Sequence, residues 1–150
     1  MLDFDGVLHA ADAGADTYFT SLSELESVLR DLRCVDVVIV SSWRHIHSLD
    51  KLRTFFSQDL RHRIVGVTPD IAPAAGSDDR GSRQREIEAW LARIEGPGLP
   101  WVALDDVASL YDPGAPVLVT PNGFGHFEAA ALRAALSDPV AFGRRCASAC

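Results

Sequence analysis

The stretch VDVVIVSSWR occupies residues 35–44, and its apolar first part stops abruptly at two serines, a tryptophan and an arginine. Apolar residues at nearly every position, rather than at alternate ones, indicate a strand that is buried on both faces, as in parallel sheets. We therefore predict a strand over residues 35–40. The polar residues 41–44 then lie at its carboxyl end, where open α/β sheets bind their ligands.

The rest of the chain repeats this alternation. Short apolar segments at residues 63–67, 101–104 and 116–119 predict further strands, and segments with helical periodicity separate them. Strands that alternate with helices predict an α/β fold, here a three-layer, Rossmann-like, doubly wound parallel sheet. The predicted helices cover residues 21–32, 47–60, 82–94 and 124–136.

Length and composition narrow the class of protein. A chain of 150 residues is the size of one domain, and we expect a domain over residues 1–136 followed by a tail over residues 137–150. No apolar run approaches the ~20 residues that span a bilayer, and no secretory signal pattern is visible, so we expect a cytoplasmic protein without a membrane partner. The net charge of −7 argues against non-specific coating of nucleic acid, which requires clustered lysine and arginine.

The chain starts with a pair of aspartates. Asp3 and Asp5 stand two residues apart and are followed by Gly6. If residues 1–4 end a strand, both carboxylates point the same way, and the glycine permits a tight turn after them. Such a pair can hold a hard cation, or supply a nucleophile and a proton donor. An aspartate-rich turn explains the same residues, so the pair alone is weak evidence.

Three further groups are placed where phosphate chemistry would require them. Ser41 and Ser42 follow the strand at residues 35–40 and offer hydroxyls and backbone amides to an anion, although a plain helix cap explains Ser42 equally well. Arg44 is either a phosphate ligand or a surface residue. Asp105 and Asp106 directly follow the strand at residues 101–104; an acidic helix cap accounts for Asp106 but less readily for Asp105.

A cation is needed to offset the charge of a phosphoryl group, and three arginines are candidates. Arg80, Arg83 and Arg85 cluster at the start of the predicted helix over residues 82–94. Positive charge at a helix N-terminus opposes the helix dipole, so at least one of them is expected to serve another purpose. Phosphate neutralisation is the natural one.

The order of these groups resembles the four motifs of the haloacid dehalogenase (HAD) superfamily. The resemblance covers approximately residues 2–120, from DFDGVL through VSSWR and the arginine-bearing helix to LDD. The VSSWR and LDD stretches, the R-x-x-E-I-x-x-W pattern at residues 83–90 and the TPNG stretch at residues 120–123 are similar to small bacterial HAD domains of RNA-repair (Swiss Army Knife) proteins.

This resemblance implies roles for the individual residues. Asp3 would be the nucleophile that forms an aspartyl-phosphate, and Asp5 the general acid and then the general base. Arg83 would stand in for the usual lysine beside the nucleophile, although Arg80 and Arg85 remain alternatives. The resemblance also implies Ser41 as a phosphate ligand, and Ser42 and Arg44 are further candidates from their position after the strand. For Mg²⁺ it implies Asp3, Asp105, Asp106 and the backbone carbonyl of Asp5.

The loops predict an open site and a large phosphorylated substrate. HAD proteins that act on small substrates usually carry an inserted cap domain, and the loops over residues 8–21 and 68–80 are too short for one. The expected function is a magnesium-dependent phosphomonoesterase (a hydrolase), with a polynucleotide terminus as a candidate substrate. The alternative is a non-catalytic or regulatory domain that keeps a metal or phosphate site.

Three neighbouring features are also of interest. Only Met1 and Leu2 precede the pair of aspartates, so the first strand is expected to be truncated, or the true start lies upstream. His9 follows the aspartate loop and is expected to be an exposed loop residue. Trp43 lies beside the expected phosphate site, although a core role is the usual one for a tryptophan.

Overall fold

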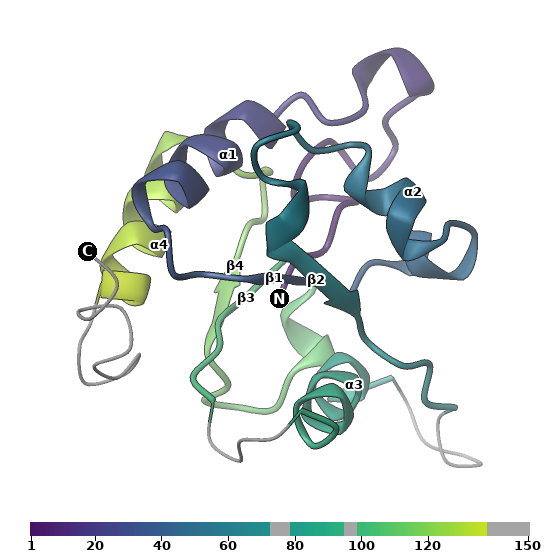
Figure 1. Cartoon of the computed structure of the whole chain (residues 1–150). Helices are drawn as coiled ribbons and strands as arrows, with labels where there is room; N and C mark the ends of the chain where they lie inside the picture. Colours follow the sequence, from purple (N-terminus) through teal and green to yellow (C-terminus); the bar gives the residue numbers. More distant parts are fainter. Residues whose placement is uncertain (73–78, 95–98, 138–150) are drawn as a thin grey trace.

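The computed structural model describes residues 1–72, 79–94 and 99–137, and its strands are the four predicted ones (Figure 1). They pair in parallel as two small sheets, β1 with β2 and β3 with β4. The protein is therefore a mixed α/β structure with parallel strands, as predicted. The strands span Val37–Ile39 (β1), Ile64–Val67 (β2), Ala103–Asp105 (β3) and Val117–Val119 (β4).

The N-terminal residues connect the two sheets. Leu2 forms parallel bridges with Ile39 of β1 and with Leu104 of β3. Its N–H donates to the carbonyl of Val38 (2.9 Å), and its carbonyl accepts from the N–H of Val40 (2.9 Å). The order across the structure is thus β2, β1, the N-terminal residues, β3 and β4. These residues make isolated bridges instead of a regular strand, which agrees with the predicted short first strand.

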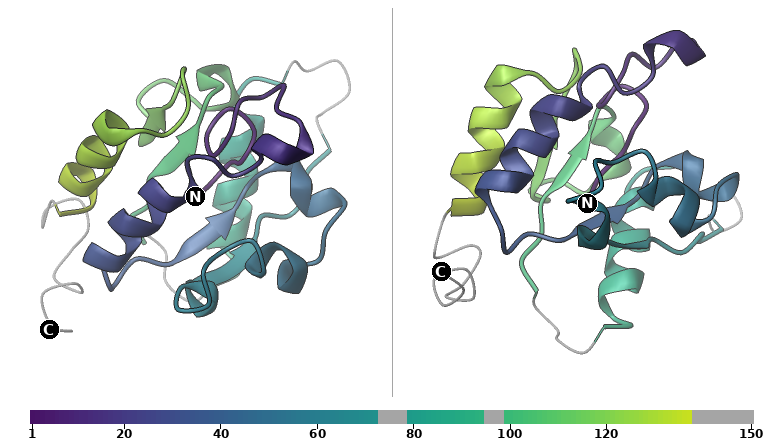
Figure 2. Two further views of the ribbon diagram at one scale, coloured as in Figure 1. Left: turned by 90° about the horizontal axis from the view of Figure 1, so that it is seen from above. Right: turned by 45° about the horizontal axis from the view of Figure 1, so that its top comes forward.

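Helices cover both sides of the strands (Figures 1 and 2). Helix α1 (Leu22–Asp31) packs beside α4 (His126–Ser137) on one side, and α3 (Ser82–Leu91) lies on the other. Helix α2 (Leu49–Arg53) contacts β2. Single turns of 3₁₀ helix complete the secondary structure: η1 (Ala15–Thr17), η2 (Ser42–His45), η3 (Arg61–Arg63) and η4 (Ala108–Leu110).

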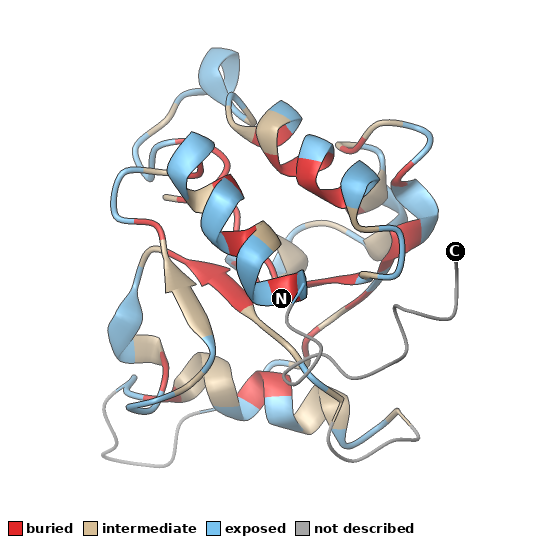
Figure 3. Cartoon of the chain, turned by 90° about the vertical axis from the view of Figure 1, so that its left-hand side faces the viewer, coloured by how far each residue is buried: buried red, intermediate tan, exposed pale blue. Residues whose placement is uncertain are grey.

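Helix α1 forms where the apolar residues recur at helical spacing. Leu22, Leu25, Val28 and Leu29 are buried and lie on one face of this helix. Buried positions therefore face the strands and exposed positions face outward, as the colouring of the helices in Figure 3 shows. Each fully buried leucine or valine side chain contributes about 1.5–3 kcal/mol relative to exposure.

The helix predicted over residues 47–60 is much shorter in the structure. Helix α2 ends at Arg53, and residues after it form turns. Ser57 explains part of the difference: its N–H donates to Glu26 Oε1 (2.7 Å) and its hydroxyl to Glu26 Oε2 (2.6 Å). The buried carboxylate on α1 thus takes a backbone N–H that a continued helix would have used itself.

The two loops at which HAD proteins carry caps are short. Residues 8–21 contain η1, and the described part of the segment between β2 and α3 contains no regular element. No cap is evident in the described residues. Within these same residues, no helix has the length and apolar character that crossing a membrane requires. The predicted tail over residues 137–150 lies, apart from Ser137 at the end of α4, outside the described residues.

Candidate active site

Buried polar residues stand at the carboxyl ends of the strands and of the N-terminal segment. Asp3, Ser41 and Asp105 were identified from the sequence, and Thr68 after β2 and Thr120 after β4 join them. The two threonines were missed, although each directly follows an apolar strand as Ser41 does. Polar side chains at these ends place the candidate site at the edge where parallel α/β sheets bind ligands.

Three carboxylates form an acidic cluster at this edge. One ligand atom from each of Asp3, Asp105 and Asp106 lies within 4.8 Å of the others. Gly6 makes room for the cluster, because a Cβ at this position would lie 2.1 Å from Asp106 Oδ2. The φ of Gly6 is +71°, which any other residue adopts only with strain. The glycine therefore permits both the turn after Asp5 and the close approach of Asp106.

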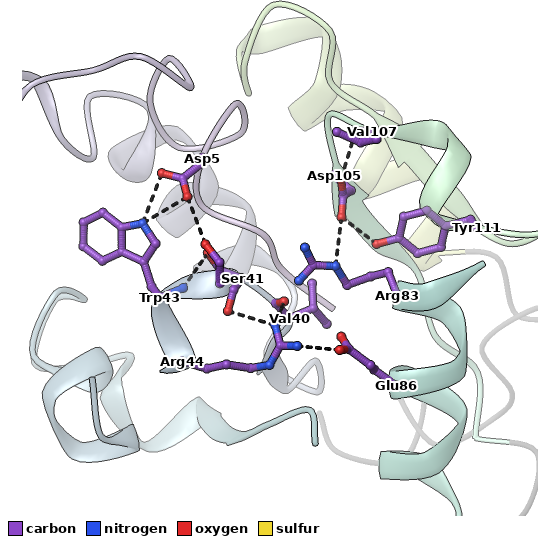
Figure 4. Close-up of polar contacts among 11 residues, drawn as sticks. Asp5, Val40, Ser41, Trp43, Arg44, Arg83, Glu86, Asp105, Val107 and Tyr111 are labelled. Atoms are coloured by element: carbon purple, nitrogen blue, oxygen red, sulfur yellow. Dashed lines mark hydrogen bonds and ion pairs between the residues drawn. The ribbon is translucent and has the colours of Figure 1, made fainter. Parts of the chain in front are cut away.

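The carboxylate of Asp105 is fully buried and held from two sides (Figure 4). Its Oδ1 accepts the N–H of Val107 (2.9 Å), and its Oδ2 accepts the hydroxyl of Tyr111 (2.9 Å). The backbone contact is an Asx-type turn, which explains why an aspartate can end a buried strand. Tyr111 was not identified from the sequence, since nothing in the pattern around it indicates a site residue.

Arg83 is the arginine of the three candidates that reaches the cluster. Its Nε lies 3.7 Å from Asp105 Oδ2 (Figure 4). Its Nη1 is buried and has no hydrogen-bond partner among the described residues. Arg80 and Arg85 are exposed, and Arg85 donates to the backbone carbonyl of Arg80 (2.8 Å). The structure thus places one nearly buried guanidinium group beside the carboxylates, with donor capacity to spare for an anion.

Burial and the repulsion of neighbouring carboxylates raise the pKa of Asp3 and of Asp105. The pKa of Asp3 rises to about 6, mainly because burial disfavours the charged form. The positive charge of Arg83 opposes this rise and the negative charge of Asp105 adds to it. The pKa of Asp105 is also raised, again mainly by burial. Without a cation, therefore, the cluster is electrostatically unfavourable at neutral pH.

Asp5 points away from this cluster and toward η2. Both of its oxygens accept from Trp43 Nε1 (3.1 Å each), and Oδ2 also accepts from the Ser42 hydroxyl (3.5 Å). His9 Nε2 lies 3.0 Å from Asp5 Oδ1. The N–H of Phe19 donates to His9 Nδ1 (3.4 Å), which leaves Nε2 to carry the proton that is donated to Asp5. Asp5 is thus separated from the acidic cluster and surrounded by donors.

His9 is not the exposed loop residue that was expected. Only 2% of it is exposed, and it contacts the rings of Tyr18, Phe19 and Trp43. The sequence gives no sign of this, because the contacts come from residues that follow in a loop and from η2. Trp43 lies beside the site, and its indole ring also packs edge-on against Phe4.

Ser41 and Arg44 have different surroundings. Ser41 is fully buried, its hydroxyl accepts the N–H of Trp43 (3.4 Å), and it also hydrogen-bonds to Asp3. The Arg44 guanidinium instead donates to Glu86 Oε1 (2.7 Å) and to the carbonyls of Val40 and Ser41 (Figure 4). This geometry does not support the prediction that Arg44 binds phosphate: its side chain is buried in an ion pair that joins η2 to α3.

The acidic cluster fits a hard divalent cation. Mg²⁺ prefers oxygen ligands and is usually held by one or two carboxylates together with substrate oxygens. Asp3, Asp105 and Asp106 supply such oxygens. A cation would favour the charged carboxylates and so lower the raised pKa of Asp3 and of Asp105. The carboxylate of Asp5 is engaged elsewhere, so its backbone carbonyl is the group left to contribute.

The raised pKa of Asp3 predicts a pH-dependent stability in EDTA. The folded protein binds the Asp3 proton more tightly than the unfolded chain, whose aspartate has its ordinary pKa of 3.8. The free energy of unfolding should therefore fall as the pH rises through about 4 to 6, by on the order of 2–3 kcal/mol from this group. Urea unfolding at pH 4.5 and 7.5 measures the loss, which should be smaller in Asp3→Asn. Equal losses in both proteins would contradict the raised pKa.

The protein is thus an α/β domain with a cluster of carboxylates, suited to binding a metal ion, at the carboxyl ends of parallel strands. A family model described as "HAD domain in Swiss Army Knife RNA repair proteins" matches residues 1–127. The chain belongs to this family. No match is found among curated proteins or among solved structures. The matched residues include the whole acidic cluster, Arg83 and the polar ends of all the strands.

Proposed function

We propose that this protein is a magnesium-dependent phosphomonoesterase that works through an aspartyl-phosphate and acts on nucleic-acid ends. One observation carries the proposal: the carboxylate of Asp3 lies within one cluster with Asp105 and Asp106, and Arg83 reaches the same cluster. A nucleophile, a set of cation ligands and a guanidinium group in one place are the parts that phosphoryl transfer requires. Membership of a family from RNA-repair proteins supports the substrate class.

The residues divide the reaction between them. A carboxylate oxygen of Asp3 attacks phosphorus, and the bond from phosphorus to the leaving-group oxygen breaks. Asp5 protonates that oxygen, and in the second step it takes a proton from the water that attacks the aspartyl-phosphate. Phosphate leaves and the Asp3 carboxylate is regenerated. Ser41 and Ser42 at the end of β1 would bind the phosphoryl oxygens together with Arg83, whose Nη1 has no hydrogen-bond partner within the part of the chain that the structure describes.

Asp5 has the surroundings that this double role requires. Its side chain is partly exposed, so it can reach a leaving group or a water molecule, while the indole of Trp43 and the imidazole of His9 fix its orientation. Mg²⁺, held by Asp3, Asp105, Asp106 and the Asp5 carbonyl, would neutralise the charge on the phosphoryl group. A bound cation would also stabilise the ionised form of the Asp3 carboxylate, which is the form that acts as a nucleophile.

The fold supports a large substrate. We infer that the two small sheets and the bridging Leu2 act as one doubly wound parallel sheet with helices on both sides, within a domain over residues 1–136. No cap is evident in the described residues, so the centre stays open to a polymer. A polynucleotide terminus satisfies this condition better than a small metabolite, for which such a site provides little enclosure.

A second candidate is a non-catalytic domain that senses a metal or phosphate. The observation that favours it is the N-terminal segment, in which Leu2 forms isolated bridges and no regular strand supports Asp3. A nucleophile displaced by about 1 Å can lose roughly 10²-fold in rate. Backbone hydrogen bonds to both neighbouring strands oppose this reading, since they hold Leu2 and Asp3 from both sides.

Phosphate release decides between the two candidates. The protein is incubated with RNA and DNA oligonucleotides that carry a 5′- or 3′-terminal phosphate, and with glycerol phosphate, in Mg²⁺ or in EDTA. We expect release in Mg²⁺, with oligonucleotides preferred, and none in EDTA. Absence of release from every substrate would overturn the enzyme proposal. Mg²⁺ or phosphate binding measured by calorimetry would then support the sensing role.

A further inference from the structure

A groove of about 420 Å³ opens beside the carboxylate of Asp5. It lies between the N-terminal loop that carries η1 and the segment from η2 to α2, which occupy the same side of the molecule in Figure 1. Half of the ten residues that line it carry aromatic rings. These five are Tyr18, Phe19, Trp43, His47 and Phe55, and Lys51 lies among the others.

The aromatic rings form a connected set with one exposed member. Tyr18 is 40% exposed, and its ring packs edge-on against Trp43 at a centroid distance of 5.1 Å. Phe19 stacks on Phe55 (4.8 Å), and Trp43 contacts both. The inner rings are thus fixed by their neighbours, and Tyr18 presents a ring to solvent at the rim. Fixed aromatic surfaces of this kind bind nucleobases by stacking with little dependence on sequence.

The charge in the groove is also informative. Lys51 is the only lysine in the chain, and its ammonium group lies 5.2 Å from the centre of the Phe55 ring. A single cation beside aromatic platforms complements a nucleotide whose base stacks and whose phosphodiester carries one negative charge. The protein as a whole has a net charge of −7, so this placement does not follow from a generally basic surface.

The groove lies next to a residue that takes part in the proposed reaction. Asp5 is one of the lining residues, and in the proposed function it protonates the leaving-group oxygen. Whatever carries that oxygen must therefore lie against Asp5, and the groove is the space that opens there. We infer that the groove is a nucleoside subsite: it holds the terminal nucleoside of a phosphorylated single strand, with Tyr18 as a stacking platform and Lys51 facing the next phosphodiester. This inference rests on the proposed function.

The test compares two trinucleotides that carry a terminal phosphate. In the first, the terminal sugar bears a base, and in the second, the terminal sugar is abasic. The readout is the ratio of kcat/KM for the first substrate to kcat/KM for the second. We expect Tyr18→Ala to lower this ratio at least about fivefold, and Tyr18→Phe, which keeps the ring, to preserve it. An unchanged ratio in Tyr18→Ala overturns the inference.

Phe127 provides the control for exposed aromatic residues. It is 85% exposed on α4 and does not line the groove. Phe127→Ala should leave the ratio unchanged, and a fall in this variant instead of Tyr18→Ala would place the subsite elsewhere. Lys51→Gln should flatten the dependence of log kcat/KM on log salt concentration by about 0.7, the slope expected for one contact to a single strand.

Binding separates failure of the subsite from failure of the enzyme proposal. If no substrate is hydrolysed, anisotropy of a labelled, unphosphorylated trinucleotide still reports on the groove. Weaker binding by Tyr18→Ala than by Tyr18→Phe would support the subsite while the catalytic proposal fails. Equal binding by these two variants, or no binding by the wild-type protein, would overturn the subsite itself.

Discussion

Replacing Asp3 by asparagine is expected to abolish magnesium-dependent phosphate release, with a fall in kcat of at least about 10³-fold. The amide of asparagine nearly matches the carboxylate in size but is a poor nucleophile and a weak ligand for Mg²⁺. The same change removes a buried carboxyl group whose pKa is raised to about 6. In EDTA at pH 7.5 the variant should therefore be at least as stable as the wild-type protein.

Loss of activity together with unchanged or higher stability would show that the variant lacks its nucleophile but is still folded. Urea unfolding measures stability, and a colorimetric phosphate assay measures kcat. Asp36→Asn is the matched control, because Asp36 is exposed just before β1, whereas the site residues lie at the opposite, carboxyl end of that strand. It should keep full activity. An active Asp3→Asn variant would rule out Asp3 as the nucleophile, whatever its stability.

Replacing Glu86 by alanine is expected to destabilise the protein by about 3–5 kcal/mol, a large fraction of the stability of a domain of this size. The Arg44 guanidinium and the Glu86 carboxylate are both largely buried, with exposed side-chain fractions of 5% and 10%. Removal of the acid leaves a buried positive charge whose remaining hydrogen bonds, among the described residues, go to the carbonyls of Val40 and Ser41. The loss should appear in the free energy of unfolding from urea titrations.

Glu88 on the same helix supplies the comparison for this effect. Its side chain is exposed and accepts a hydrogen bond from Gln84, so Glu88→Ala should change stability by no more than about 0.5 kcal/mol. A double variant, Arg44→Met with Glu86→Leu, should recover much of the loss, because it removes both charges. If Glu86→Ala proves as stable as Glu88→Ala, the buried ion pair does not hold η2 to α3.

The sequence predicted the strands better than the contacts around the site. Strands buried on both faces are continuous apolar runs, and the polar residues that end them are visible as abrupt changes in pattern. This is why Asp3, Ser41 and Asp105 could be placed at one edge before the structure was known. Helical spacing alone could not show that Glu26 takes the N–H of Ser57 and that α2 therefore ends early.

The partners of the site residues depend on tertiary contacts that no local pattern records. Arg44 follows two serines at a strand end, which is a reasonable place for a phosphate ligand, yet Glu86 lies on a distant helix and pairs with it. Tyr111 reaches Asp105 across η4, and His9 reaches Asp5 through a loop. Among the three arginines, the sequence left Arg80 and Arg85 as alternatives, whereas in the folded protein Arg83 lies beside Asp105.

The most direct test of the central claim is detection of a phosphoryl group on Asp3. Asp5→Asn removes the base that activates water, so an aspartyl-phosphate should accumulate when an activated ester such as p-nitrophenyl phosphate makes protonation of the leaving group unnecessary. After acid quench, mass spectrometry of the N-terminal peptide should show one added phosphoryl group on Asp3, in Mg²⁺ but not in EDTA. Steady phosphate release by this variant without any modified Asp3 would contradict the account.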